Sequence, residues 1–389
     1  MPRRSPERPR PLAAPARSPT EPQDDGAGLA DGPVGYPRSM ASYPTLFEPL
    51  AITGSSAFPN RIVMGPMTLN QATASGHVTD WIVDWYERRA DGGTGTLIGA
   101  AAFVSQNGRG WANAVGIADD TYLDGWKRCA DAAHQHGALF GPQLFHAGAA
   151  SRVALLGHDP LCPSEWTREG FDSARAMSVD EIEQVIADFG AAAKRAIDAG
   201  SDFVEIHGAH GYLVHQFWRR DVNRRSDRWG DPLEFPAAVV QAVRAQLPAG
   251  TPLLYRFSIH ADDPNAPNHP VTPRSLGDFL KRLESAGVDA WDISCWHEGK
   301  RGYFGTDRRL PDHVRDHSKL PRIVAGNILT PEDGADYLAG GHAEAVALAR
   351  ALIMDAAWAA KARSGHSDAI RPVLGDSWRT INQGVDPGT

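Results

Sequence analysis

The sequence is poor in cysteine. Its 389 residues include three cysteines, Cys129, Cys162 and Cys295, which are far apart and form no Cys-x-x-Cys pair. This spacing provides neither a zinc ribbon nor an iron–sulfur cluster. We therefore expect no metal centre, and three reduced, partly buried thiols in a cytoplasmic protein.

Long apolar runs and an excess of positive charge are also missing. The sequence has no run of about 18 apolar residues, so it predicts no membrane-spanning helix. The formal net charge is −8, whereas a general nucleic-acid-binding domain is normally basic. The sequence therefore predicts neither nucleic acid nor a membrane as a partner, and it leaves a homo-oligomer open.

The N-terminal segment has almost no apolar periodicity. Residues 1–39 contain nine prolines, six arginines and five acidic residues, and such a segment cannot bury enough surface to offset its chain entropy. It also lacks the apolar run of a secretory signal, and its acidic residues argue against a transit peptide. We predict a disordered extension over residues 1–43, followed by one domain over residues 44–389 that has a C-terminal tail from about residue 366.

From residue 44 onward, short apolar or β-branched runs alternate with amphipathic helical patterns. The predicted strands are 61–65, 95–100, 138–143, 202–207, 252–258, 290–294, 322–325 and 345–349. The predicted helices are 79–91, 120–136, 178–199, 232–246, 273–286, 331–339 and 356–364, with a weaker one at 311–319. Eight such pairs, with strands too apolar to face water, indicate an α/β fold, the (β/α)8 TIM barrel.

An open, doubly wound sheet is the alternative fold. It would normally carry a glycine-rich dinucleotide loop after its first strand, where this sequence has Pro66-Met67-Thr68. We therefore favour the closed barrel, with residues 44–60 forming a short hairpin or cap at its bottom.

Polar residues stand at the ends of several predicted strands, where the active site of a TIM barrel lies. Gln143, His207 and Arg256 end or follow the third to fifth strands, Gly326-Asn327 follows the seventh, and Arg350 follows the eighth. The loops after strands seven and eight are the usual phosphate site of this fold, and a guanidinium suits bidentate phosphate binding. The sequence therefore predicts a phosphate-bearing cofactor.

A long signature around the fourth strand carries a family resemblance. Residues 204–213 read Val-Glu-Ile-His-Gly-Ala-His-Gly-Tyr-Leu, and Asn-Arg-Arg-Ser-Asp-Arg-Trp-Gly follows at 223–230. With supporting matches at 66–68, 88–93, 143–148 and 256–258, the chain resembles the old yellow enzyme family of FMN-dependent ene-reductases over residues 44–365. The resemblance implies a flavin bound by residues of several strand ends: Pro66, Met67, Thr68 and Ala100 along the ring, Gln143 and Arg256 at its pyrimidine end, and Gly326, Asn327, Ala349 and Arg350 at the phosphate.

The resemblance also implies a reaction. NADPH or NADH would reduce the flavin, which would pass hydride to the β-carbon of an α,β-unsaturated carbonyl compound. His207 and His210 would bind the carbonyl oxygen, and Tyr212 would protonate the α-carbon. A lone histidine at a strand end is more often structural, but two histidines three positions apart, with a tyrosine two further on, favour catalysis.

Two alternatives are open. One is an FMN-dependent dehydrogenase or demethylase on the same barrel, although relatives of that kind carry cluster-binding cysteines and further domains. The other is a flavin-binding protein without turnover. Ala149, where relatives often have arginine, and the unusual loop at 291–303 indicate an altered substrate mouth.

Overall fold

The computed structural model describes residues 43–259, 271–295 and 302–388. The predicted N-terminal extension lies outside the described residues apart from Tyr43. So does the part of the predicted substrate-side loop at 296–301.

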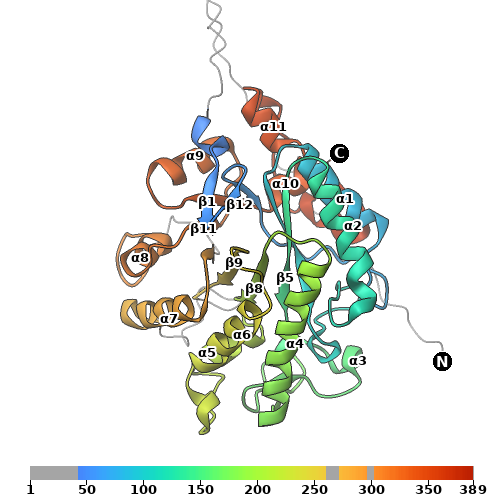
Figure 1. Ribbon diagram of the computed structural model, residues 1–389, viewed down its shortest axis with the longest axis vertical. Coiled ribbons are helices and arrows are strands. Elements are labelled where there is room, and N and C mark those ends of the chain that lie inside the picture. Colours follow the sequence, from blue (N-terminus) through green and yellow to red (C-terminus); the bar gives the residue numbers. More distant parts are fainter. Residues whose placement is uncertain (1–42, 260–270, 296–301, 389) are drawn as a thin grey trace, which may run out of the picture. The chain divides into compact units, whose positions relative to one another are not determined.

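Eight parallel strands close into a barrel (Figure 1), in the order β10-β11-β12-β3-β4-β5-β8-β9. They are β3 (Ile62–Met64), β4 (Thr96–Phe103), β5 (Leu139–Phe145), β8 (Val204–Gly208), β9 (Leu253–Phe257), β10 (Ala290–Ser294), β11 (Arg322–Ala325) and β12 (Ala345–Leu348). Each predicted strand corresponds to one of them, so the predicted (β/α)8 barrel is confirmed. Two further short strands, β6 (Leu161–Cys162) and β7 (Arg175–Ala176), pair outside the barrel.

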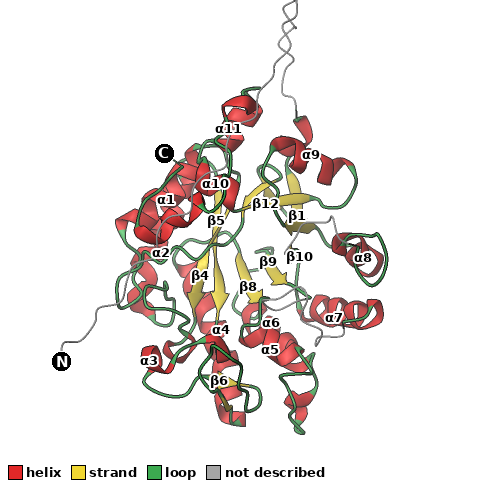
Figure 2. Ribbon diagram, turned by 180° about the vertical axis from the view of Figure 1, so that it is seen from behind, coloured by secondary structure: helices red, strands yellow, loops and turns green. Residues whose placement is uncertain are grey.

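Helices surround the strands (Figure 2). They are α1 (Asp80–Asp91), α2 (Leu123–His134), α3 (Val153–Leu156), α4 (Val179–Asp198), α5 (Leu213–Trp218), α6 (Glu234–Arg244), α7 (Pro273–Ala286), α8 (Leu310–His317), α9 (Pro331–Ala339), α10 (Arg350–Met354) and α11 (Trp358–Arg363). The long α4 begins at a capping box in which Ser178 and Glu181 exchange hydrogen bonds, which supplies partners for otherwise orphaned N–H groups. Among the described residues, no helix is long and apolar enough to cross a bilayer.

Two strands run further than the sequence indicates. The pairs Ala102–Leu144 and Phe103–Phe145 continue the ladder of β4 and β5 past the predicted ends, because these residues are buried on both strands. The register shifts between Gly99 and Ala101, and the N–H of Ala100 donates instead to Tyr86 Oη, 2.8 Å away. Ala100 therefore lies in a bulge inside β4, a feature that re-aims backbone next to active sites.

The bottom of the barrel is closed by the hairpin of β1 (Leu50–Thr53) and β2 (Ser56–Phe58). Leu50 and Phe58 join Val63, Leu254 and other inward-facing residues in one buried cluster. Burial of a side chain of this size contributes about 1.5–3 kcal/mol. The predicted hairpin therefore seals the end of the barrel opposite the strand carboxyl ends.

The segment after residue 366 packs onto the barrel. Asp386 accepts two hydrogen bonds from the fully buried Arg89 of α1, both at 2.9 Å, and the Arg89 guanidinium lies 3.2 Å from the centre of the Trp85 ring. Breaking a buried ion pair by removing one partner costs about 3–5 kcal/mol. This contact fixes the described C-terminal residues against α1.

Candidate active site

The end of β8 brings three predicted residues together. The ring centre of His207 lies 5.1 Å from that of His210 and 5.0 Å from that of Tyr212, with the rings nearly perpendicular in both pairs. Phe145, the last residue of β5, packs edge-on against Tyr212 at 4.6 Å. Two imidazoles and a phenol therefore share one corner of the barrel mouth, against an aromatic wall.

The tautomer of His207 follows from its surroundings. Its Nδ1 accepts a hydrogen bond from the backbone N–H of Ala209 at 3.2 Å, so Nδ1 carries no proton. A neutral imidazole then has its proton on Nε2. Among the described residues Nε2 has no hydrogen-bond partner, which leaves an N–H donor of this largely buried side chain available to a ligand.

His210 is held in an uncommon conformation. Its φ of 59° lies in the left-handed region, which costs a non-glycine residue roughly 1–2 kcal/mol. Two serines stabilise it: Ser258 accepts from its backbone N–H at 3.0 Å, and the Ser294 hydroxyl lies 2.8 Å from its Nε2. Neither serine has a role in the sequence-based interpretation, because β9 and β10 bring them to His210 only when the barrel is assembled.

Both histidines are neutral at pH 7. Burial lowers the pKa of His207 well below its usual range, and the neighbouring His210 and Arg256 lower it further. Burial, with Arg256, lowers the pKa of His210 to about 3. The pair therefore offers neutral N–H donors rather than charged imidazolium groups.

A buried polar chain crosses the barrel beside the histidines. Gln143 Nε2 donates to Glu205 Oε1 at 2.7 Å, and Arg256 Nη1 donates to Asp292 Oδ2 at 2.5 Å. The residues come from neighbouring strands, β5 and β8 for the first pair and β9 and β10 for the second. Sequence reasoning singled out Gln143 and Arg256 but missed both carboxylates, although an acidic residue within an apolar strand is itself a signal of a buried polar site.

Arg256 also approaches the predicted ring-lining segment after β3. A Cβ placed on Gly65 would lie 3.7 Å from Arg256 Nη1, so the guanidinium sits directly beside the segment that starts at Pro66. Pro66 and Met67 are half-buried and Thr68 is exposed. Thr68 and Ala100 line one small hollow, so the residues expected along a flavin ring lie beside one another.

The predicted phosphate residues meet after β11 and β12, which are adjacent strands. Arg350 Nη2 donates to Asn327 Oδ1 at 2.5 Å, and Asn327 has a positive φ of 49°. Within the described chain, the backbone N–H groups of Gly326, Asn327, Ala349 and Arg350 donate to no other residue. Converging N–H groups beside a guanidinium form a cradle suited to a phosphate.

These groups fit FMN. One cation and free N–H groups stand where a phosphate is expected, and Arg256 with Gln143 stands where charge develops on a reduced flavin ring. Residues able to stabilise both charges are what the protein must supply to this cofactor.

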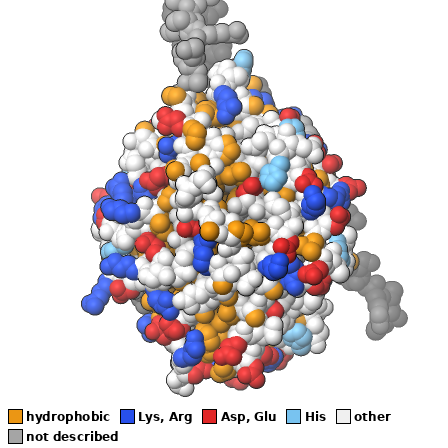
Figure 3. Space-filling model, viewed as in Figure 1, with side chains coloured by type: hydrophobic (Ala, Val, Ile, Leu, Met, Phe, Trp, Pro, Cys, Tyr) orange, Lys and Arg blue, Asp and Glu red, His pale blue; other side chains and the backbone are white. Residues whose placement is uncertain are grey.

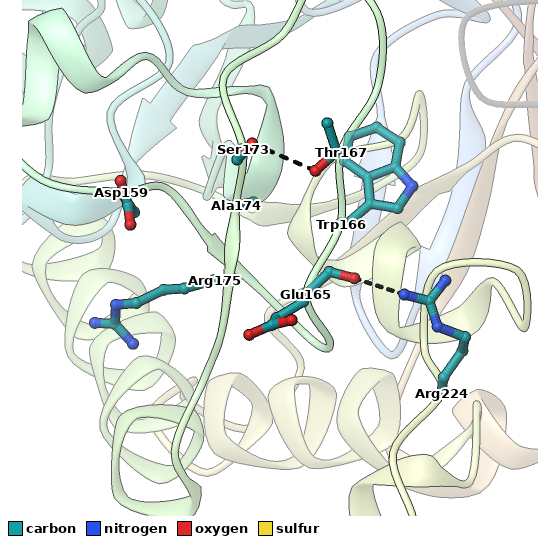
Figure 4. Close-up of a pocket in the computed structure, with 8 residues that line it drawn as sticks. All are labelled: Asp159, Glu165, Trp166, Thr167, Ser173, Ala174, Arg175 and Arg224. Carbon is teal, nitrogen blue, oxygen red and sulfur yellow. Dashed lines mark hydrogen bonds between the residues drawn. The ribbon is translucent and has the colours of Figure 1, made fainter.

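A separate hollow of about 600 Å³ is formed by the segment between β5 and α4 together with Arg224 (Figure 4). Its two arginines are already engaged: Arg175 pairs with Glu181 at 2.5 Å, and Arg224 donates to the backbone oxygen of Glu165 at 2.6 Å. On the face shown in Figure 3, acidic and basic side chains are interspersed around hydrophobic ones. Neither feature competes with the barrel mouth as a site.

A (β/α)8 barrel with this set of groups at its strand ends defines a class, the flavin-dependent TIM-barrel oxidoreductases. Residues 45–369 match the model of the NADH:flavin oxidoreductase / NADH oxidase family, and the chain belongs to that family. It is thus a member of the old yellow enzyme type, and FMN is the cofactor.

Relatives and solved structures agree with this assignment. An NADH oxidase of Thermoanaerobacter brockii is 33% identical over 350 residues, covering 86% of this chain and 53% of that protein. The chain thus spans about half the length of this relative. An old yellow enzyme homologue from Zymomonas mobilis has a TM-score of 0.75 at 27% identity, covering 89% of this chain and 99% of that one. A morphinone reductase in complex with tetrahydroNAD has a TM-score of 0.75 at 26% identity, covering 86% and 94% of the two chains.

Proposed function

We propose that this protein is an ene-reductase that reduces the C=C bond of α,β-unsaturated carbonyl compounds. The observation that carries the proposal is the available Nε2–H of His207, fixed by the Ala209 hydrogen bond at 3.2 Å and placed beside Tyr212. Bound FMN supplies the hydride chemistry, and the chain supplies the groups that bind and protonate the substrate.

His207 and His210 bind the carbonyl oxygen. The Nε2–H of His207 donates to it without displacing a protein partner. The Ser294 hydroxyl on His210 Nε2 orients the imidazole, and the other ring nitrogen, Nδ1, donates to the substrate oxygen. Hydrogen bonds to an oxygen that gains negative charge strengthen as the charge develops, which lowers the barrier.

Tyr212 is the proton donor. Its phenol reaches the same corner as the two histidines and packs against Phe145 and His207, so its ring has little freedom. The hydroxyl proton passes to the α-carbon of the substrate. A positioned general acid of this kind contributes about 10²–10⁴-fold in rate.

Four residues hold the cofactor phosphate, and two residues hold the pyrimidine end of the flavin ring. Gly326, Asn327, Ala349 and Arg350 bind the phosphate, and Gln143 and Arg256 bind the ring where it becomes negative. Pro66, Met67, Thr68 and Ala100 line the ring. These residues belong to one domain of residues 44–389.

The proposal is tested by anaerobic turnover with NADH or NADPH and a cyclic enone, with analysis of the product. The expected result is stoichiometric formation of the saturated ketone. If the enone is returned unchanged while an amine donor reduces the flavin, the protein is a dehydrogenase or demethylase instead. If neither compound exchanges electrons with the flavin, the protein binds flavin without this turnover.

A further inference from the structure

Two carboxyl groups lie side by side in the barrel interior. Glu205 of β8 and Asp292 of β10 are both 0% exposed, and they flank Arg256 on the strand between them. One oxygen of each has a donor: Glu205 Oε1 accepts from Gln143, and Asp292 Oδ2 accepts from Arg256. The other oxygens, Glu205 Oε2 and Asp292 Oδ1, are buried without a donor among the described residues.

The two carboxyl groups are close enough for the charge of Asp292 to raise the pKa of Glu205. A carboxylate only accepts hydrogen bonds, so two neighbouring carboxyl groups can hydrogen-bond to each other only when one of them carries a proton. Two ionised carboxylates that interact in a dry interior would repel each other strongly, and the usual outcome is one shared proton. A shared proton would also give the two unpaired oxygens a partner.

The position of the proton follows from the partners. Asp292 accepts a hydrogen bond directly from the Arg256 guanidinium, which stabilises its charged form. The hydrogen-bond donor of Glu205 is the neutral amide of Gln143, and Arg256 acts on it without a direct hydrogen bond. Burial and the charge of Asp292 hold the pKa of Glu205 well above its usual range. Glu205 is therefore the acid and Asp292 the carboxylate.

We infer that Glu205 and Asp292 hold one proton between them and act as a positioning pair, which orients Gln143 and sets the positive charge that Arg256 presents to the flavin. The inference rests on the proposed function in that Gln143 and Arg256 bind the pyrimidine end of the ring. The four side chains form a continuous chain of amide, acid, carboxylate and guanidinium.

Together, these four side chains have no net charge. Without the proton they would carry one negative charge beside a ring that itself becomes negative on reduction, and reduction would be disfavoured. The proton on Glu205 therefore raises the midpoint potential of the flavin, although Glu205 is not a catalytic residue.

Infrared difference spectroscopy tests the proton directly, on the FMN-free protein. Wild type minus Glu205→Gln is expected to show the C=O stretch of a protonated carboxyl group at neutral pH. Glu344→Gln is the matched control, because Glu344 pairs with Arg322 at 2.6 Å near the surface and should show carboxylate bands alone. Carboxylate bands alone for Glu205 would overturn the inference.

Redox titration of the FMN-loaded protein tests the effect of the pair on the midpoint potential of the flavin. Glu205→Gln replaces a neutral acid by a neutral amide, so the midpoint potential should stay at the wild-type value. Combining Glu205→Gln with Asp292→Asn removes the one negative charge that offsets Arg256, so the potential of the double variant should rise. A rise in Glu205→Gln alone would show that Glu205 is ionised, and no rise in the double variant would show that the pair does not act on the flavin; either result contradicts the inference.

If the double variant does not fold, the infrared band and the Glu205→Gln potential still decide. Neither measurement uses an enone. Failure to reduce enones would therefore count against the proposed function alone, and a missing carboxyl band against the proton pair alone.

Discussion

The Nε2 atom of His210 lies 2.8 Å from the Oγ of Ser294, and this contact ties the second residue after β8 to the last residue of β10. The same hydroxyl lies 3.4 Å from Arg256 Nη2. Ser294 thus stands between the proposed substrate site and the proposed flavin site, and it holds His210 in the orientation that the carbonyl oxygen requires.

Ser294→Ala should weaken phenol binding while FMN remains bound. Phenolates imitate the enolate oxygen that the histidines stabilise, and a lost orienting hydrogen bond costs about 0.5–1.5 kcal/mol, which corresponds to roughly two- to tenfold in affinity. Titration of the flavin absorbance with a phenol measures the effect. Ser285→Ala, which removes an exposed hydroxyl bound to Lys281 O, is the control and should not change the affinity. Equal phenol affinities in the two variants would show that Ser294 takes no part in substrate binding.

His207→Ala should have a larger effect than Ser294→Ala. It removes a direct donor to a charged oxygen, worth about 1.5–3 kcal/mol, so phenol affinity should fall by about ten- to a hundredfold. The double change with His210→Ala should abolish binding without releasing FMN. Unaltered phenol affinity in the double variant contradicts the role given to both histidines.

Tyr212→Phe should slow enone reduction by about 10²–10⁴-fold. Reduction of the flavin by NADH or NADPH should continue at the wild-type rate, because the ring contacts with Phe145 and His207 persist. Stopped-flow absorbance separates the two half-reactions. An unchanged oxidative half-reaction would assign the proton to water or to another residue.

The neutral His210 predicts a pH dependence of stability. Above a pH of about 6.5 the His210 ring is neutral in both the folded and the unfolded chain. In that range its lowered pKa does not change the free energy of unfolding. As the pH falls, the unfolded chain takes up a proton that the folded protein refuses until about pH 3, so folding weakens by about 1.4 kcal/mol per pH unit.

His210→Asn should remove this part of the dependence. Between pH 7 and pH 5 the variant should lose about 2 kcal/mol less unfolding free energy than wild type. Urea unfolding at the two pH values measures it. Identical losses would mean that His210 is protonated in the folded protein.

Arg350→Ala should weaken FMN binding by about ten- to a hundredfold, because it removes a charge-assisted contact to the phosphate. Fluorescence titration of the FMN-free protein gives the affinity. Arg128→Ala removes a partly exposed arginine paired with Asp80 and should bind FMN as wild type does. A wild-type affinity in Arg350→Ala would place the phosphate elsewhere.

The sequence predicts the barrel because its strands are buried on both faces and read as short apolar runs between helical periods. It misses α3, α5 and α10, which have four, six and five residues, too few to show a helical period. It also ends β4 early, because the bulge at Ala100 interrupts the pattern.

The residues of the candidate site were likewise predicted only in part. His207, His210 and Tyr212 are close in sequence and read as one signature. Glu205, Asp292 and Ser294 gain their significance only where β8, β9 and β10 lie side by side, and a single sequence does not show which side chains meet across strands. The ion pair of Arg89 and Asp386 joins residues far apart in the chain and was missed for the same reason.

The most direct test is an anaerobic single turnover. FMN-loaded protein, reduced with one equivalent of NADH or NADPH, is mixed with cyclohex-2-enone, and the flavin absorbance is followed. Wild type should recover its oxidised spectrum with formation of cyclohexanone, and the His207→Ala/His210→Ala variant should recover it at least a hundredfold more slowly. A flavin that stays reduced in wild type with the enone, yet reoxidises when oxygen is admitted, would contradict the assignment as an ene-reductase.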